Sequence, residues 1–195
     1  MSRIVRSVLA IGTGVAALAG GLTVAVAVAD EPPAAAAARA AAVAPPTAVR
    51  LRAGVGDLCL TIARGSLRNG TDATASACAD DAENQRFDLV PTGAGTFELR
   101  AGHSGKCLEV QSAGTKAGSV VQQWWCGQGQ HQRWSMIMVD IAKESYELRP
   151  VHTATGTNRC LDIAPVGKDA GASAQLWPCN GSGAQKWRLE PVTAA

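Results

Sequence analysis

The amino-terminal quarter of this 195-residue chain differs in composition from the remainder. None of the eight aromatic residues (five Trp, two Phe and one Tyr) and none of the six cysteines lies within the first 48 positions. The hydrophobic fraction of 47% is raised in this region by alanine. The length fits one domain with an appended segment, and the residues able to form that domain begin after position 48.

The chain also lacks an excess of charge of either sign. Arg3 and Arg6 fall in a predicted targeting segment, and taking them from the 18 basic residues leaves 16, equal to the 16 acidic residues. A strongly basic protein that binds nucleic acid or an anionic membrane is therefore disfavoured. No Gly-rich phosphate loop precedes a helix, so nucleotide chemistry is not indicated.

The first 29 residues have the pattern of an export signal. Arg3 and Arg6 precede an uncharged run over residues 8–29, which predicts cleavage after Ala29 and secretion of the mature protein. The alternative is an uncleaved membrane anchor, because a helix rising about 1.5 Å per residue could cross roughly 30 Å of hydrocarbon over this run. Residues 30–48 are rich in Ala and Pro, and this composition predicts a linker.

The remainder of the chain consists of three copies of one unit, at about residues 49–95, 96–144 and 145–195. Each copy contains a Cys-Leu element (Cys-Leu-Thr-Ile, Cys-Leu-Glu-Val or Cys-Leu-Asp-Ile) and a second Cys 19 positions after the first. Each copy closes with Gln-Arg-Phe, Gln-Arg-Trp or Gln-Lys-Trp. A recurrence at this period is the signature of a repeat architecture.

Short strands dominate the predicted secondary structure of each copy. The segment from Phe97 to Arg100 alternates apolar and polar residues, which is the period-two pattern of a half-buried strand. No stretch sustains an apolar 3.6-residue period for three turns, so helix bundles and βαβ units are disfavoured. Three units, each too small to bury a core alone, should pack around a pseudo-threefold axis. Each unit should contribute apolar strand residues to the shared core, such as Leu51, Leu99 and Leu148. The predicted fold class is all-β, a β-trefoil.

The repeat also predicts how the cysteines pair. Six cysteines allow fifteen pairings, but copies of one unit should repeat one bond. The prediction is one disulfide within each copy: Cys59 to Cys78, Cys107 to Cys126 and Cys160 to Cys179. Disulfides fit export to an oxidising compartment. Zinc ligation needs close pairs such as Cys-x-x-Cys, which are absent from the sequence, and we expect no metal or other cofactor.

With its Cys-Leu-Asp-Ile-like elements and closing Gln-x-Trp motifs, the chain resembles the ricin-B-type β-trefoil lectins and the related carbohydrate-binding modules of secreted xylan- and galactose-acting enzymes. The resemblance covers about residues 49–192. It implies a secreted, non-catalytic module that binds galactose- or xylose-type glycans, and a core role for Phe87, Trp134 and Trp187. We expect a polysaccharide or glycan ligand, no membrane contact beyond a possible N-terminal anchor, and a monomer. The alternative is an extracellular protein-interaction or inhibitor trefoil.

The resemblance implies a sugar site in the third copy. The residues at the family's binding positions are Asp162, Gln175, Trp177 and Gln185. A carboxylate can accept strong hydrogen bonds from vicinal hydroxyl groups, and an aromatic ring can cover the apolar face of a sugar. Ala184 stands where the family usually has Asn, and the loss of one neutral hydrogen bond costs on the order of 1 kcal/mol.

A second site is implied in the second copy, with a different set of residues. The positions are filled by Glu109, Gln122, Trp124 and Gln132, with His131 in place of Asn. Glu is one methylene longer than Asp, so either the sugar sits differently or the site is silent. A protonated His131 beside Glu109 would make binding sensitive to pH.

The first copy is not expected to bind sugar. It has Thr61 in place of the carboxylate, Thr74 in place of Gln and Ser76 in place of the aromatic residue.

In the second copy, Trp124 and Trp125 are adjacent, so an extended strand would turn them to opposite sides. We expect Trp124 to face outward and Trp125 to pack inward.

The sequence does not favour catalysis. Hydrolysis of a glycoside requires two carboxylates about 5 to 10 Å apart, and each predicted site has one. The segment from Gly102 to Gly105 does not form a Gly-x-Ser-x-Gly nucleophile elbow, because Lys106 occupies its last position. We therefore expect that the chain is not an enzyme and has no catalytic residues.

Overall fold

The computed structural model describes residues 48–164 and 171–192. The predicted export signal at residues 1–29 and nearly all of the predicted linker at residues 30–48 lie outside the described residues. Within the described part, no helix has the length and apolar character needed to cross a membrane.

The described residues form twelve β-strands and six short 3-10 turns. In the first repeat the strands are β1 (Ala48–Ala53), β2 (Leu58–Ile62), β3 (Thr71–Ala77) and β4 (Arg86–Gly93). In the second they are β5 (Thr96–Ala101), β6 (Cys107–Val110), β7 (Val121–Trp124) and β8 (Arg133–Asp140). In the third they are β9 (Ser145–Pro150), β10 (Arg159–Ile163), β11 (Ala172–Pro178) and β12 (Trp187–Pro191). The 3-10 turns are η1 (Ala63–Gly65), η2 (Glu83–Gln85), η3 (Gln111–Ala113), η4 (Gln130–Gln132), η5 (Val151–Thr153) and η6 (Gly183–Gln185).

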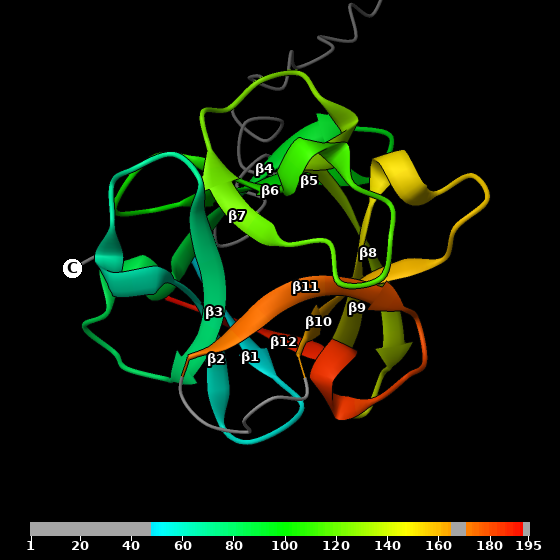
Figure 1. Cartoon of the computed structure of the whole chain (residues 1–195). Helices are drawn as coiled ribbons and strands as arrows, with labels where there is room; N and C mark the ends of the chain where they lie inside the picture. Colours follow the sequence, from blue (N-terminus) through cyan, green and yellow to red (C-terminus); the bar gives the residue numbers. More distant parts are fainter. Residues whose placement is uncertain (1–47, 165–170, 193–195) are drawn as a thin grey trace, which may run out of the picture. The chain divides into compact units, whose positions relative to one another are not determined.

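Strand pairing defines a closed barrel with three hairpins attached to it. β1 pairs with β4 and β12, β5 pairs with β4 and β8, and β9 pairs with β8 and β12, so six strands close a ring. The other six form the hairpins β2–β3, β6–β7 and β10–β11, one in each repeat. These hairpins meet where β3 pairs with both β7 and β11, around the centre of the view in Figure 1. This arrangement is a β-trefoil, which confirms the predicted fold class.

The core is built from equivalent positions of the three repeats. The leucines of the first strand in each repeat are buried, and so are the closing aromatic residues, as predicted: these are Leu51, Leu99, Leu148, Phe87, Trp134 and Trp187. The indole N–H of Trp134 donates to the carbonyl oxygen of Leu108 at 3.0 Å, and that of Trp187 donates to Leu161 at 3.1 Å. Each indole is thus buried with its polar group paired, so its burial leaves no costly orphan donor.

The three predicted disulfides are present. They join Cys59 to Cys78, Cys107 to Cys126 and Cys160 to Cys179. The first cysteine of each pair lies on β2, β6 or β10, and the second follows the last strand of the same hairpin. Each disulfide therefore closes the open end of one hairpin. A disulfide that closes a loop of this length stabilises the folded protein by roughly 3 kcal/mol, because it restricts the unfolded chain.

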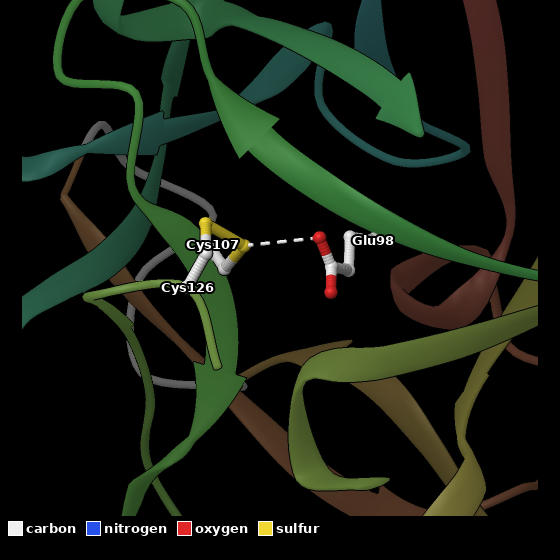
Figure 2. A group of neighbouring side chains, drawn as sticks. All are labelled: Glu98, Cys107 and Cys126. Atoms are coloured by element: carbon white, nitrogen blue, oxygen red, sulfur yellow. Dashed lines mark hydrogen bonds between the residues drawn. A yellow bond between two sulfur atoms is a disulfide. The ribbon is translucent and has the colours of Figure 1, made fainter. Parts of the chain in front are cut away.

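Glu98 occupies a polar position of the alternating pattern in β5, yet its side chain is buried. One of its carboxylate oxygens lies 3.6 Å from Sγ of Cys107 in the disulfide with Cys126 (Figure 2). The guanidinium of Arg100 pairs with this carboxylate at 2.8 Å, which compensates the buried charge. Glu147 repeats the arrangement in the third repeat. Because the sulfur atoms are bonded to one another, neither Glu-Cys-Cys group offers a thiolate to a metal ion.

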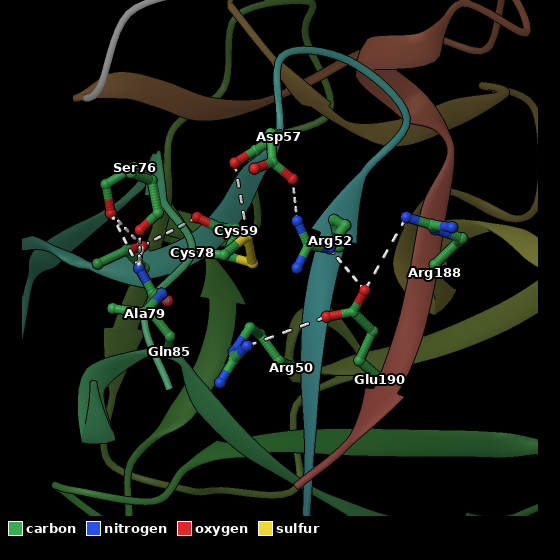
Figure 3. Close-up of a disulfide and its surroundings, with 12 residues drawn as sticks. Arg50, Arg52, Asp57, Cys59, Ser76, Cys78, Ala79, Gln85, Arg188 and Glu190 are labelled. Atoms are coloured by element: carbon green, nitrogen blue, oxygen red, sulfur yellow. Dashed lines mark hydrogen bonds and ion pairs between the residues drawn. A yellow bond between two sulfur atoms is a disulfide. The ribbon is translucent and has the colours of Figure 1, made fainter. Parts of the chain in front are cut away.

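The first repeat differs from the others at this same position. It carries Arg50 where they carry glutamate, and Figure 3 shows Arg50 and Arg52 near the disulfide between Cys59 and Cys78. Arg50 is buried and pairs with Asp80 at 3.0 Å. The pseudo-symmetry is therefore a symmetry of the backbone, while the charges on it differ from repeat to repeat.

Candidate functional site

In the third repeat, a carboxylate is held between two amide groups. Asp162 on β10 lies opposite Gln175 on β11 in the strand register. Gln175 Nε2 donates to one carboxylate oxygen of Asp162 at 2.9 Å, and Gln185 Nε2 donates to the other at 3.0 Å. Burial raises the pKa of Asp162, and the hydrogen bonds from Gln175 and then Gln185 offset part of this rise. The cluster thus presents an oriented acceptor in a recessed position.

An exposed aromatic ring lies on the same strand as this acceptor. Trp177 is two residues after Gln175 on β11, so both side chains are on the same side of the strand. Leu176 between them faces the other side and is fully buried in the core. Trp177 is 40% exposed. The structure therefore brings three of the predicted site residues, Asp162, Gln175 and Trp177, to one face of the β10–β11 hairpin.

The second repeat forms the same arrangement with a longer carboxylate. Glu109 on β6 lies opposite Gln122 on β7. Gln122 Nε2 and Gln132 Nε2 each donate to a different carboxylate oxygen of Glu109, both at 2.8 Å. His131 Nε2 lies 3.4 Å from the oxygen that Gln132 also contacts. Trp124, two residues after Gln122, is 42% exposed. The extra methylene of Glu does not disturb the pair of amide contacts.

An open pocket of about 620 Å³ covers this second cluster. It is lined by side chains that include Glu109, Gln122, Trp124, Trp125, His131 and Gln132. Gly70 also contributes to its wall, so the first repeat takes part in it. A pocket of this size falls within the range of about 300–1,000 Å³ found for small-molecule sites.

The glutamines of the closing motif are buried together with the carboxylates, since Glu109 and Asp162 are each only 4% exposed. Gln185 is 0% exposed; its Oε1 accepts from the backbone N–H of Asn180 at 2.8 Å, and its Nε2 also donates to the carbonyl oxygen of Pro178 at 3.0 Å. Gln132 repeats these backbone contacts in the second repeat. The structure therefore places Gln132 and Gln185 as residues that orient the carboxylates and fasten the backbone around the second cysteine.

The first repeat keeps the glutamine but not the acceptor. Gln85 Nε2 donates to Thr61 Oγ1 at 3.1 Å and to Ser76 Oγ at 3.2 Å, and these two hydroxyl groups share a hydrogen bond of 2.6 Å. Thr74 Oγ1 donates to the backbone carbonyl of Thr61. The hydroxyl groups bond to one another, and the charged acceptor and the exposed ring found in the other two repeats are replaced by Thr61 and Ser76.

The expectation that Trp125 packs inward was wrong. Trp125 is 65% exposed, because β7 ends at Trp124 and the strand alternation does not continue to the next residue. Lys106 Nζ lies 4.0 Å from the centroid of the Trp125 ring, within the range of a cation–π contact. Trp125 also lines the pocket over Glu109. The sequence did contain a signal for this second exposed ring. The second repeat has Trp124-Trp125 before its cysteine, where the third repeat has Trp177-Pro178.

A six-stranded barrel with three hairpins, two of which carry a recessed carboxylate beside an exposed tryptophan, defines the class of lectin-like β-trefoils. The model of the family described as "Ricin-type beta-trefoil lectin domain-like" matches residues 42–124, 83–156 and 130–195. The chain belongs to this family. No curated protein matches the chain in sequence.

Solved structures share the fold over about three quarters of the chain. A designed threefold-symmetric protein, ThreeFoil, is 28% identical with a TM-score of 0.68, over 74% of this chain and 98% of its own. The exo-β-1,3-galactanase 1,3Gal43A from Clostridium thermocellum is 24% identical with a TM-score of 0.67, over 75% of this chain but only 30% of the enzyme. The ricin B-like lectin of Macrolepiota procera, solved with lactose, is 16% identical with a TM-score of 0.61, over 76% of this chain and 97% of the lectin. Because the galactanase and the Macrolepiota procera lectin are less than 25% identical to this chain, their similarity to it shows a shared fold alone.

Proposed function

We propose that this protein is a non-catalytic carbohydrate-binding module that binds galactose- or xylose-type glycans through the clusters of its second and third repeats. The observation that carries the proposal is the pair of equivalent clusters, each with a carboxylate oriented by two amides beside a half-exposed tryptophan. The lactose bound to the Macrolepiota procera lectin and the galactan specificity in the name of the Clostridium enzyme support a galactose-containing ligand.

The chemistry of the two clusters suits a sugar. A carboxylate oxygen offers about two lone-pair directions, so Asp162 and Glu109 keep acceptor capacity after bonding to the amides. Hydrogen bonds from sugar hydroxyl groups to an ionised acceptor are roughly twice as strong as neutral ones. Since the amides already fix the carboxylate, little side-chain ordering remains to be completed when the ligand binds. Trp177 and Trp124 supply the apolar surface.

The two clusters act together only on a ligand that reaches both. Each is shallow and offers few contacts, so binding of one sugar unit at one cluster is weak. A polysaccharide that engages both gains from effective concentration, by about 10²- to 10⁴-fold where the geometry allows simultaneous contact. The natural ligand under this proposal is therefore a polymer or a surface with many glycan chains.

The proposal includes export and a non-catalytic role. The pattern of residues 1–29 supports secretion, and three disulfides suit an oxidising compartment. Each cluster contains one carboxylate, whereas glycoside hydrolysis uses two about 5 to 10 Å apart. A mature protein that begins near Asp30 in the culture medium would support export, and recovery of the intact chain only in membranes would contradict it.

A glycan array combined with a pull-down on insoluble polysaccharides tests the binding. We expect the oxidised protein to bind galactose- or xylose-containing glycans, with weaker binding after Trp177→Ala or Trp124→Ala. Ile141→Ala is the matched control, because Ile141 is an exposed apolar side chain outside both clusters. A folded protein that binds no glycan would overturn the proposal and favour the protein-interaction alternative.

A further inference from the structure

The second-repeat pocket contains an exposed aromatic ring that its third-repeat counterpart lacks. Trp125 is the most exposed aromatic side chain in the described residues and lines the same pocket as Glu109 and Trp124. The equivalent residue, immediately before the second cysteine, is Pro178 in the third repeat and Ala77 in the first. The ring is thus an addition to one of two otherwise matching clusters.

Lys106 holds this ring in place. The Lys106 side chain is buried, and its Nζ lies 4.0 Å from the ring centroid of Trp125. One face of the indole is therefore covered by the lysine, while the side chain as a whole is 65% exposed. The third repeat has Arg159 at the position of Lys106 but no ring for it to hold. A ring that is supported on one side and open on the other is prepared for stacking.

An unused acceptor lies in the same pocket. Gln122 Nε2 donates to Glu109, but Gln122 Oε1 is buried without a hydrogen-bond partner among the described residues. A side chain added at Gly70 would approach this oxygen at 3.9 Å and the ring of Trp124 at 3.5 Å, so the glycine keeps the wall open. Buried acceptors are normally paired, so this oxygen marks an incomplete set of hydrogen bonds in the wall of the pocket.

We propose that the second-repeat pocket binds two consecutive sugar units of a glycan chain, one on Glu109 and Trp124 and the next stacked on Trp125. The inference rests on the proposed function and adds to it a preference for chains over single sugars at this pocket. The third-repeat cluster, with Pro178 in place of the second ring, takes one unit.

Calorimetry on the full chain tests this inference with ligands of increasing length. The probes are galactose, β-1,3-galactobiose and β-1,3-galactotriose, with xylose, xylobiose and xylotriose as a second series. The titrations use the Trp177→Ala background, so that the second repeat is observed alone. We expect the disaccharide of the recognised series to bind up to about tenfold more tightly than the monosaccharide, as one additional aromatic contact allows.

Trp125→Ala should remove this gain and leave the affinity for the monosaccharide nearly unchanged. Trp125→Phe keeps a ring and should restore part of the gain, and Trp124→Ala should weaken binding of both ligands. As an independent readout, the indole N–H resonance of Trp125 should shift with the disaccharide but not with the monosaccharide.

The outcomes separate this inference from the function on which it rests. Equal affinities for the monosaccharide and disaccharide, or an equal loss of both after Trp125→Ala, would overturn the inference and leave sugar binding intact. Binding by the unsubstituted chain but not by the Trp177→Ala background would also overturn it and leave the third-repeat site. Absence of sugar binding by the unsubstituted chain would overturn both.

Discussion

The second and third repeats build the same carboxylate arrangement from different residues. Glu109 and Asp162 differ by one methylene, yet each accepts two amide hydrogen bonds between 2.8 and 3.0 Å. In both repeats the carboxylate lies directly opposite a glutamine across a hairpin ladder, Gln122 in one and Gln175 in the other. The register of the strands therefore determines the cluster, and the side chains adapt to it.

The first repeat shows which part of this cluster belongs to the fold alone. Gln85 makes the same backbone contacts as its two counterparts, accepting from the N–H of Ala79 and donating to the carbonyl of Ala77. It makes them although Thr61 stands in the place of the carboxylate. The closing glutamine is thus common to the architecture, and the carboxylate and the exposed ring distinguish the two candidate sites.

The largest expected effect separates the buried tryptophans from the exposed ones. Trp187→Ala should destabilise the protein by about 3–5 kcal/mol, because it opens a cavity in the core and leaves the carbonyl of Leu161 without its donor. Trp177→Ala should change the free energy of unfolding by less than about 1 kcal/mol, because its ring is partly in solvent. Denaturant unfolding of the two variants measures the difference, and equal losses would contradict the assignment of their roles.

A smaller effect distinguishes the closing glutamines from the carboxylates. Replacing Gln85, Gln132 or Gln185 by Ala should cost about 1–3 kcal/mol of stability each, since each change removes a buried amide and its hydrogen bonds to the backbone. Only Gln132→Ala and Gln185→Ala should also weaken glycan binding, because only they release a carboxylate. Thermal unfolding and calorimetry on the three variants test this. A loss of binding after Gln85→Ala would show that the first repeat participates.

The carboxyl group of Asp162 should titrate at a higher pH than that of an ordinary aspartate. Because burial raises the pKa of Asp162, its carboxylate should protonate above the usual value of about 3.9. As pH falls through this raised pKa, the third-repeat acceptor loses its charge and glycan binding there should weaken. In the same window the folded protein binds more protons than the unfolded chain, so Asp162 makes unfolding less favourable as the pH falls. Carbon NMR titration of Asp162 measures the pKa directly, and a value at or below the usual one would refute this expectation.

The smallest effect concerns the one departure of the third repeat from the family pattern. Ala184→Asn adds an amide beside the cluster and should increase glycan affinity by up to about fivefold, the worth of one neutral hydrogen bond near 1 kcal/mol. Asn84→Ala in the first repeat is the matched control and should leave affinity unchanged, because Asn84 donates to the backbone carbonyl of Ile62. Calorimetry at neutral pH compares the two. A decrease in affinity after Ala184→Asn would mean that the added amide obstructs the ligand.

Much of the fold was predictable because it recurs three times in the sequence. The 19-residue spacing of the cysteines predicted each disulfide, and the closing motif predicted the burial of Phe87, Trp134 and Trp187. The outward position of Trp125 was not predictable from alternation, because it depends on the residue at which β7 ends. Nor did the alternating pattern reveal that Glu98 is buried, because a disulfide from another part of the repeat lies against it.

The sequence by itself determined the repeat, the all-β class, the pairing of the cysteines and the residues that could carry a glycan site. The first three features follow from the spacing of a pattern that recurs three times along the chain, and the candidate glycan residues follow from the resemblance to the ricin-B-type lectins. The tertiary structure alone decided which of the candidate side chains reach the surface. The carboxylates Glu109 and Asp162 are buried together with Gln132 and Gln185, whereas Trp124, Trp125 and Trp177 are exposed. The exposure of a side chain depends on how hairpins and turns that are distant in sequence pack against one another. A local sequence pattern does not predict this packing.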